Sequence, residues 1–471
     1  MSSSPDLDAF VKTYDVRGLV GSQLTDEVVS AIGAAFVDEI GASGKDVVVG
    51  HDMRDSSPGF ARAFAEGARA RGADVVAIGL CSTDESYFAS GSMNAAAAMF
   101  TASHNPATYN GIKLSRAGAR GISLDTGLAA IRDRAKEYLA SGIPPLATQG
   151  SYREADVLAD YASYLRGLVD LSGIRPLRVV VDAGNGMGGM TVPAVLGTAA
   201  GLPALPLDLI PLYFDLDGTF PNHEANPLEP ANLVDLQKAV VEHRADLGLA
   251  FDGDADRCFV IDERGEPMNP SAVAAVVAVR EIARARSLGE DGELYIIHNL
   301  ITSRIVPETI LAAGAVPVRT RVGHSLIKDE MAATGAVFGG EHSAHYYFRD
   351  FWGADNGMLA AMHLLAEFGA QDGPLSAMSR DFTPYSMSGE LNSVVTDVPA
   401  AYERIVTAYS DSDFDELDGL TVSGNSEGAF WWFNVRPSNT EPLLRLNVEA
   451  ETVPLMERVR DSVLSLIRSV H

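Results

Sequence analysis

Three aspartates in one short segment carry the clearest chemical signal in the sequence. Asp252, Asp254 and Asp256 stand at alternate positions directly after the apolar run LGLAF. In a strand this spacing puts three carboxylates on one face, and in a turn it lets them converge on one cation. Clustered carboxylates repel one another without a counter-ion, so we predict a hard divalent cation here, with a solvated acidic turn as the alternative. An EF-hand loop is excluded, because Arg257 takes the place of the required glycine.

A serine and a histidine are adjacent in TASHNPATYNGIK, residues 101–113. Neighbouring side chains usually diverge, and no GxSxG motif surrounds Ser103, so Ser103 and His104 are not predicted to form a nucleophile–base pair. A phosphorylated Ser103 would instead supply the charged oxygen that three aspartates and Mg²⁺ leave open. Lys113 and Arg257 could then hold the transferring phosphoryl group. The alternative is a hydroxyl-capped turn.

A third segment, GGEHSAHYYF, places Glu341 and Ser343 two positions apart after two glycines, and His345 follows two positions later. A carboxylate with a hydroxyl suits the vicinal hydroxyl groups of a sugar, although either residue could equally cap a turn.

A fourth segment, VRPSNTEPLLR, lies between two predicted strands. An arginine with several small donors suits a phosphate monoester, whose three oxygens need many hydrogen bonds. The donors are Arg436, Ser438, Asn439 and Thr440. An ordinary Asn-Thr turn in a hairpin is the alternative.

Composition limits the classes of function. The net charge of −27 disfavours nucleic acid and anionic membranes as partners, and any anionic substrate needs a local cluster of basic residues. The sequence has no 18-residue apolar run, and its first residues lack the pattern of a signal peptide. Cys81 and Cys258 lie too far apart in the sequence to indicate a disulfide framework. We therefore expect a cytoplasmic protein.

The length of 471 residues predicts two to four domains. Residues 45–79, 177–208 and 293–323 each contain an apolar run, a polar or glycine-rich loop, an alanine-rich helix and a second apolar run. This order predicts three α/β domains with parallel crossovers. The tail alternates strands and helices differently and predicts a smaller α+β domain. The expected domains are residues 1–150, 151–252, 253–375 and 376–471.

Taken together, the motifs resemble the α-D-phosphohexomutase superfamily, and in particular its bacterial phosphomannomutase/phosphoglucomutase branch. The resemblance covers essentially the whole chain. It runs through YDVRG, GHDMRDSSP, TASHNP, DGDADR, GEHSAH and RPSNTEP in this order. Each motif alone is only suggestive, whereas all of them in register are specific.

The resemblance implies a heart-shaped molecule, with three related α/β domains of mixed sheets, a smaller C-terminal α+β domain and a central cleft. It also implies a phosphohexomutase that interconverts hexose 6-phosphate and hexose 1-phosphate through a phosphoserine and a hexose 1,6-bisphosphate. Mannose is the expected preferred sugar, and glucose is an open second one. Mg²⁺ is the expected cofactor, the bisphosphate the expected activator, and a monomer or weak dimer the expected state.

The resemblance also assigns residues. The expected catalytic residues are Ser103, Lys113, Arg257 and His345, with His345 as a proton shuttle. The expected metal ligands are Ser103, Asp252, Asp254 and Asp256. The expected substrate-binding residues are Tyr14, Arg17, His324, Glu341, Ser343, Arg436, Ser438, Asn439 and Thr440.

Several positions depart from the family's pattern. Ala255 and Ala344 stand where glycine is common, so Ala255 is expected to adopt an ordinary backbone conformation. The segment GLCSTD lacks a frequent Thr-Pro, and the usual lysine of the third domain is replaced near His298 and Asn299. This last change leaves one sugar or phosphate contact unassigned.

Three other functions remain open. A phosphoglucosamine mutase would share the motifs, although such enzymes have GEQSGH rather than GEHSAH in the third one. A metal-dependent sugar-phosphate phosphatase would use the same serine and aspartates and release phosphate without isomerising the sugar. A regulatory protein that binds a metal or a sugar phosphate would perform no reaction.

Overall fold

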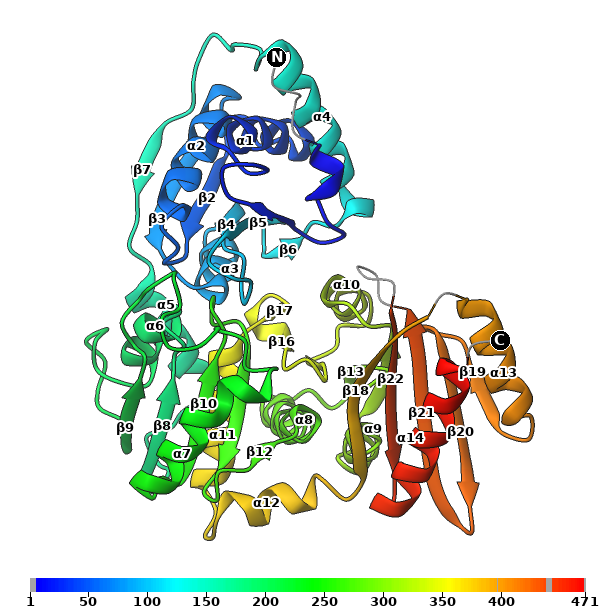
Figure 1. Cartoon of the computed structure of the whole chain (residues 1–471). Helices are drawn as coiled ribbons and strands as arrows, with labels where there is room; N and C mark the ends of the chain where they lie inside the picture. Colours follow the sequence, from blue (N-terminus) through cyan, green and yellow to red (C-terminus); the bar gives the residue numbers. More distant parts are fainter. Residues whose placement is uncertain (1–5, 396, 438–442, 470–471) are drawn as a thin grey trace.

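The computed structural model of the protein describes residues 6–395, 397–437 and 443–469, without the side chains of residues 324 and 325. Four sheets follow one another along the chain, and Figure 1 shows each with its own helices. This confirms the predicted class of three α/β domains with mixed sheets and a smaller C-terminal domain. Among the described residues, no helix combines the length and the apolar composition that a membrane span requires.

The first sheet has the strand order β1-β5-β4-β2-β3-β7, with the short β6 beside β5. Strands β2, β3 and β4 are parallel and nearly continuous in apolar residues, as expected for strands buried on both faces. The strands are β1 (Val16–Leu19), β2 (Asp46–His51), β3 (Asp74–Leu80), β4 (Ala96–Phe100), β5 (Tyr109–Arg116), β6 (Arg120–Gly121) and β7 (Tyr152–Glu154). The helices are η1 (Leu7–Ala9), α1 (Asp26–Ile40), α2 (Ser57–Ala70), α3 (Thr83–Ser92), η2 (Leu124–Thr126) and α4 (Leu128–Ser141).

The second and third sheets repeat one design. In each, the predicted strand–helix–strand unit is parallel, a further strand pairs in parallel, and the next strand returns antiparallel. The second sheet contains β8 (Leu177–Asp182), β9 (Leu207–Leu212), β10 (Leu247–Phe251), β11 (Cys258–Asp262) and β12 (Pro267–Met268). The third contains β13 (Tyr295–Asn299), β14 (Val316–Thr320), β15 (Phe338–Gly340), β16 (Tyr346–Phe348) and β17 (Ala354–Asp355). The helices of this half are α5 (Leu158–Leu168), α6 (Gly188–Val195), η3 (Pro230–Leu233), α7 (Val234–His243), α8 (Pro270–Ser287), α9 (Ile305–Ala312), α10 (His324–Thr334), η4 (Arg349–Phe351), α11 (Gly357–Gly369) and α12 (Leu375–Asp381).

The fourth sheet is antiparallel throughout, in the order β18-β22-β21-β20-β19. Helices α13 (Val398–Ala408) and α14 (Val453–Arg468) pack on it, and their apolar residues share its core. The strands are β18 (Ser386–Val394), β19 (Asp413–Asp415), β20 (Leu420–Ser426), β21 (Ala429–Pro437) and β22 (Leu443–Ala450).

Two expected domain boundaries fall inside sheets. Strand β11 pairs with β10 and β12 pairs with β11, so the second unit continues past Asp252 at least to Met268. Strand β7 pairs with β3, so the first sheet continues past residue 150. The predicted boundary after Asp252 is wrong because the acidic loop is the turn of a hairpin that joins β10 to β11 within one sheet.

The apolar core explains which parts form one body. One cluster of buried side chains extends from a face of the first sheet through the second and third sheets. A second cluster fills the other face of the first sheet, and a separate one fills the fourth domain. The first three domains therefore share a core, whereas the fourth has its own.

Helix α3 begins with two buried carboxyl groups. Ser82 and Glu85 form a capping box, in which the Glu85 carboxylate accepts from the Ser82 amide and the Glu85 amide donates to Ser82 Oγ. Burial raises the pKa of Asp84 to about 7. Burial, together with the charge of Asp84, raises the pKa of Glu85 to about 8.

These carboxyl groups predict a pH dependence of stability. The folded-state pKa of Glu85 lies above the value of an unfolded chain. Protonated Glu85 therefore contributes to the free energy of unfolding at low pH, and this contribution is lost as the pH rises from about 5 through about 8. Glu85→Gln keeps a capping side chain without this proton. Over that range its free energy of unfolding should fall less steeply than that of the wild type, by up to about 1 kcal/mol per pH unit. Urea denaturation at several pH values measures the slopes, with exposed Glu27→Gln as the control; equal slopes for Glu85→Gln and the wild type would contradict the assignment.

Candidate active site

Three loops at equivalent places in three sheets meet at one cavity. Each loop joins a strand that is parallel to its neighbour to a strand that returns antiparallel: β4 to β5, β10 to β11 and β15 to β16. Carboxyl ends of parallel strands are where α/β sheets place ligands. The three loops carry Ser103, the three aspartates, and Glu341 with His345, respectively.

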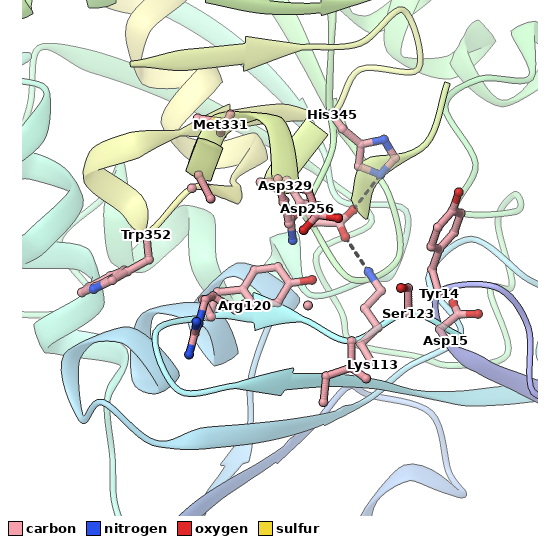
Figure 2. A pocket seen from close by; sticks show the side chains of 18 of the residues that line it. Tyr14, Asp15, Lys113, Arg120, Ser123, Asp256, Asp329, Met331, His345 and Trp352 are labelled. Carbon is pink, nitrogen blue, oxygen red and sulfur yellow. Dashed lines mark hydrogen bonds and ion pairs between the residues drawn. The ribbon is translucent and has the colours of Figure 1, made fainter. Parts of the chain in front are cut away.

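The cavity has a volume of about 480 Å³ and lies between the first and third domains, at the acidic loop (residues 252–256) of the second. Figure 2 shows Lys113 and His345 reaching Asp256 from opposite walls. The predicted residues that line it are Tyr14, Arg17, Ser103, Lys113, Asp256, Arg257 and His345. Basic side chains therefore do cluster locally in an acidic protein.

Ser103 points its hydroxyl into the acidic loop. The residue is 5% exposed, and its Oγ donates to Asp252 Oδ2 at 2.9 Å. Two further nitrogens lie near Ser103 Oγ: Arg257 Nη2 at 3.4 Å and His104 Nδ1 at 3.2 Å. Burial and Arg257 lower the pKa of His104 well below its usual value. A neutral His104 that accepts a hydrogen bond from Arg257 at 2.6 Å fits a supporting role better than that of a base.

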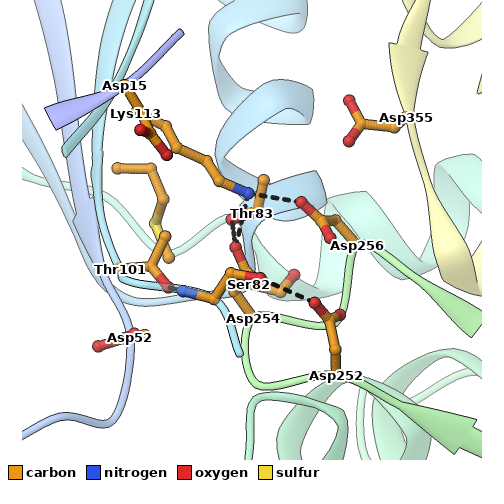
Figure 3. A network of polar contacts seen from close by, with 12 residues as sticks. Asp15, Asp52, Ser82, Thr83, Thr101, Lys113, Asp252, Asp254, Asp256 and Asp355 are labelled. Atoms are coloured by element: carbon orange, nitrogen blue, oxygen red, sulfur yellow. Dashed lines mark hydrogen bonds and ion pairs between the residues drawn. The ribbon is translucent and has the colours of Figure 1, made fainter. Parts of the chain in front are cut away.

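The three aspartates are buried and converge, as Figure 3 shows. Lys113 Nζ lies 2.7 Å from Asp254 Oδ2 and 2.5 Å from Asp256 Oδ2. Although burial opposes ionisation, Lys113 holds the pKa of Asp254 below its usual value. Burial and the charge of Asp254 raise the pKa of Asp256 to about 6. The negative charge of this loop therefore needs positive charge nearby, because buried carboxylates are stable only when a cation balances them.

The donor set fits a hard divalent cation. One carboxylate oxygen from each aspartate lies within 4.8 Å of the other two. Asp254 Oδ1 and Asp256 Oδ1 are buried and make no hydrogen bond among the described residues. Unpaired buried carboxylate oxygens are costly unless a cation binds them, and oxygen-only sites suit Mg²⁺.

The backbone of this loop differs from the expectation. Ala255 has a φ of 63° and Ala344 a φ of 65°, so both adopt the left-handed conformation rather than an ordinary one. A side chain costs about 1–2 kcal/mol in that conformation, and alanine is small enough to be accommodated. At Gly253, in contrast, a Cβ would lie 2.4 Å from the carbonyl oxygen of Ser103, so the two loops touch there through backbone.

The third loop joins a carboxylate to a histidine. Glu341 accepts from Tyr347 Oη at 2.8 Å and from Asn299 Nδ2 at 3.2 Å. Ser343 Oγ lies 3.1 Å from His345 Nδ1, and His345 Nε2 lies 3.9 Å from Asp256 Oδ1. Burial lowers the pKa of His345 to about 4. His345 is therefore neutral near pH 7.

Other predicted residues have different surroundings. Arg17 donates to Asp15 at 2.6 Å and to Asn105 of the serine loop at 2.7 Å. Arg436 binds Glu390 at 2.9 Å, and the cavity wall contains no described residue of the fourth domain. Ser438, Asn439 and Thr440 lie outside the described residues, as does the side chain of His324.

The sequence reasoning missed some residues beside the aspartates. Thr83 donates its hydroxyl to Asp254 Oδ2 at 2.6 Å and its amide to the Asp254 carbonyl at 3.0 Å. Lys328 Nζ lies 2.7 Å from Asp355 Oδ1, on the wall of the same cavity. Asp355 and His345 also lie close enough to Asp256 for the three to share a cation. The segment GLCSTD contained Thr83 but gave no signal for its role, because its partner lies in another domain.

Four family models match consecutive parts of the chain. They are described as phosphoglucomutase/phosphomannomutase α/β/α domains I, II and III and the C-terminal domain of the same family. They match residues 9–140, 159–265, 269–385 and 390–466. The second match extends past Asp252, as the second sheet does.

Relatives match along nearly the whole chain. A protein of Xanthomonas campestris pv. campestris described as "Phosphohexose mutases" is 39% identical over 98% of this chain and 99% of its own length. A phosphomannomutase of Salmonella montevideo is 38% identical over 97% of this chain and 98% of its own. Among solved structures, a phosphoglucomutase/phosphomannomutase family protein from Burkholderia thailandensis matches with a TM-score of 0.85 and 30% identity, covering 99% and 98% of the two chains. The chain therefore belongs to the phosphoglucomutase/phosphomannomutase family of isomerases.

Proposed function

We propose that this enzyme interconverts hexose 6-phosphate and hexose 1-phosphate through a phosphoserine at Ser103 and a hexose 1,6-bisphosphate, with mannose as the preferred sugar. The observation that carries the proposal is the contact of Ser103 Oγ with Asp252 Oδ2 at 2.9 Å, beside Arg257 and next to three converging carboxylates. A phosphate on this oxygen would lie between the acidic loop and two cationic side chains. Support for mannose comes from the relative named phosphomannomutase and from the third motif, GEHSAH.

The side chains divide the reaction between them. In the first half-reaction the bond between phosphorus and Ser103 Oγ breaks, and a bond forms to the free hydroxyl oxygen of the sugar. Arg257 and Lys113 balance the charge of the moving phosphoryl group. His345, neutral because it is buried, takes the proton from the sugar hydroxyl at Nε2. The bisphosphate then turns around. In the second half-reaction the bond between its other phosphorus and the sugar oxygen breaks, a bond forms between that phosphorus and Ser103 Oγ, and His345 returns the proton to the sugar oxygen.

Asp252, Asp254 and Asp256 would hold Mg²⁺ together with an oxygen on Ser103. When bound, Mg²⁺ neutralises negative charge on the phosphoryl oxygens. Thr83 and Lys113 orient Asp254 through hydrogen bonds of 2.6 and 2.7 Å. Glu341 would select sugar hydroxyl groups, and Tyr347 and Asn299 fix its carboxylate. Asn299, which lies where the family's usual lysine is replaced, thereby contacts the carboxylate of Glu341.

Further side chains would bind the rest of the substrate. Tyr14 and Arg17 line the cavity and would contact the substrate. Arg436, Ser438, Asn439, Thr440 and His324 are retained as substrate-binding residues on the strength of the family resemblance. We also retain hexose 1,6-bisphosphate as the activator, because it would phosphorylate Ser103 in an enzyme molecule that has lost its phosphate.

A test of the phosphoserine uses Ser103→Ala. This variant should lose at least about 10³-fold in kcat, because the oxygen that carries the phosphoryl group is gone. Intact mass spectrometry after incubation with hexose 1,6-bisphosphate should show one added phosphate on the wild type and none on the variant. Ser141→Ala, at an exposed position at the end of α4, is the control. A Ser103→Ala variant with wild-type activity would remove Ser103 from the mechanism.

The metal assignment predicts a binding change that is independent of turnover. Asp254→Asn removes one of three ligand charges, so isothermal titration with Mg²⁺ should give a dissociation constant raised by more than about 10-fold. The exposed Asp208→Asn should bind as the wild type does. Unchanged Mg²⁺ affinity in Asp254→Asn would place the metal elsewhere.

A substrate panel distinguishes the alternatives. Coupled assays with mannose 1-phosphate, glucose 1-phosphate and glucosamine 1-phosphate should give the highest kcat/KM for mannose 1-phosphate, with stimulation by hexose 1,6-bisphosphate. Phosphate release should be negligible, because the phosphoryl group passes to the sugar rather than to water. Activity confined to glucosamine 1-phosphate would identify a phosphoglucosamine mutase, and phosphate release without isomerised sugar would identify a phosphatase.

A further inference from the structure

A buried arginine lies beneath the serine loop. Arg54 follows strand β2, and its side chain is 2% exposed. Its guanidinium donates four hydrogen bonds, all to backbone carbonyl oxygens of residues 103–109. Nη2 donates to Ser103 at 2.9 Å and Asn105 at 2.6 Å, and Nη1 donates to Pro106 and Tyr109 at 3.0 Å each. One side chain therefore binds four backbone carbonyl groups of this loop.

The guanidinium is itself held on two sides. Asp52 Oδ2 lies 3.3 Å from Arg54 Nε, and Asp52 Oδ1 accepts from Ser57 Oγ at 2.6 Å. The ring of Phe220, from the second domain, lies 5.1 Å from Arg54 Cζ. A planar guanidinium offers its N–H groups in a fixed fork, whereas lysine offers three donors from one point. Lysine at this position could not reach carbonyl groups spread over the whole loop.

Ser103 needs such a support. Its φ of 50° is left-handed, a conformation that a residue with a side chain adopts only when its surroundings hold it there. The Ser103 carbonyl is bound by Arg54 and is approached closely by Gly253 of the acidic loop. No peptide bond of the described chain is cis, and the C=O and N–H of a trans peptide point in opposite directions. Because the Ser103 carbonyl points toward Arg54, the His104 N–H points away from it. The peptide after Ser103 is thus fixed between two domains.

We propose that Arg54 is a positioning residue for phosphoryl transfer, which holds the backbone of residues 103–109 so that Ser103 Oγ stays beside Asp252 and Arg257. This inference rests on the proposed role of Ser103. Arg54 is not among the residues that line the cavity, and its contact with the site is the hydrogen bond to the Ser103 carbonyl, so it acts through the backbone of the loop. Loss of the fork should therefore slow the chemical step and leave sugar binding nearly unchanged.

The test is Arg54→Lys, which keeps the charge and loses the fork. We expect kcat to fall about 10–100-fold, because a displacement of about 1 Å at the reacting atom costs this much. KM should change by less than about 3-fold. The ³¹P resonance of the phosphoserine should shift or broaden, a change that a loss of global stability alone would not produce in the folded protein.

A matched control is available in the second domain. Arg166 also donates to three backbone carbonyl groups, those of Val195 at the end of α6 and of Gly197 and Pro203 after it, far along the chain from Ser103. Arg166→Lys should lower the melting temperature but leave kcat and the ³¹P resonance as in the wild type. This comparison separates loop support in general from support of the serine loop.

Three outcomes would overturn the proposal. A folded, phosphorylated Arg54→Lys with wild-type kcat would overturn it while leaving the phosphoserine mechanism intact. If Arg54→Lys does not fold, Asp52→Asn removes the charge opposite Arg54 Nε and should lower kcat at constant KM, so a wild-type kcat there would also count against it. A wild-type protein that never carries phosphate on Ser103 would overturn both the inference and the proposed function.

Discussion

The site depends on buried charge that is nearly, but not fully, balanced. Three aspartates with almost no solvent exposure face Lys113 and Arg257, and two carboxylate oxygens make no hydrogen bond among the described residues. Burial alone would push these groups to neutrality, whereas the two cations keep Asp254 ionised. The structure must therefore bring residues of different domains to within hydrogen-bond distance. This requirement explains why the first three domains share one apolar core, while the fourth, which contributes no described residue to the cavity, has its own.

Local sequence patterns could predict the repeated units but not where they join. The strand–helix–strand segments were recognisable because buried parallel strands are continuous apolar runs and crossover helices are rich in alanine. The boundary after Asp252 was wrong, because pairing of β10 with β11 is set by tertiary hydrogen bonds. The left-handed Ala255 was also unexpected, because alanine disfavours that conformation and only the surrounding contacts hold it.

The site shows the same division. Ser103, Asp252, Lys113 and His345 lie in recognisable motifs, and the structure brings their side chains into one region. Thr83 and Asp355 lie in segments whose composition suits ordinary caps and strand ends, and Arg54 lies in GHDMRDSSP, which indicated the family but no role for the arginine. Their roles come from partners up to 171 positions away in the sequence, as for Thr83 and Asp254. Contacts of this kind leave no periodic pattern for a single sequence to reveal.

The three loops share one more feature: each carries a left-handed residue that is not glycine, namely Ser103, Ala255 and Ala344. The same reversal of the chain thus serves to carry a phosphate, to gather carboxylates and to face a sugar in the proposed mechanism. Substrate specificity could therefore change through substitutions in the third loop alone. The first two loops are in backbone contact at Gly253, so a change in the backbone of one would require a matching change in the other.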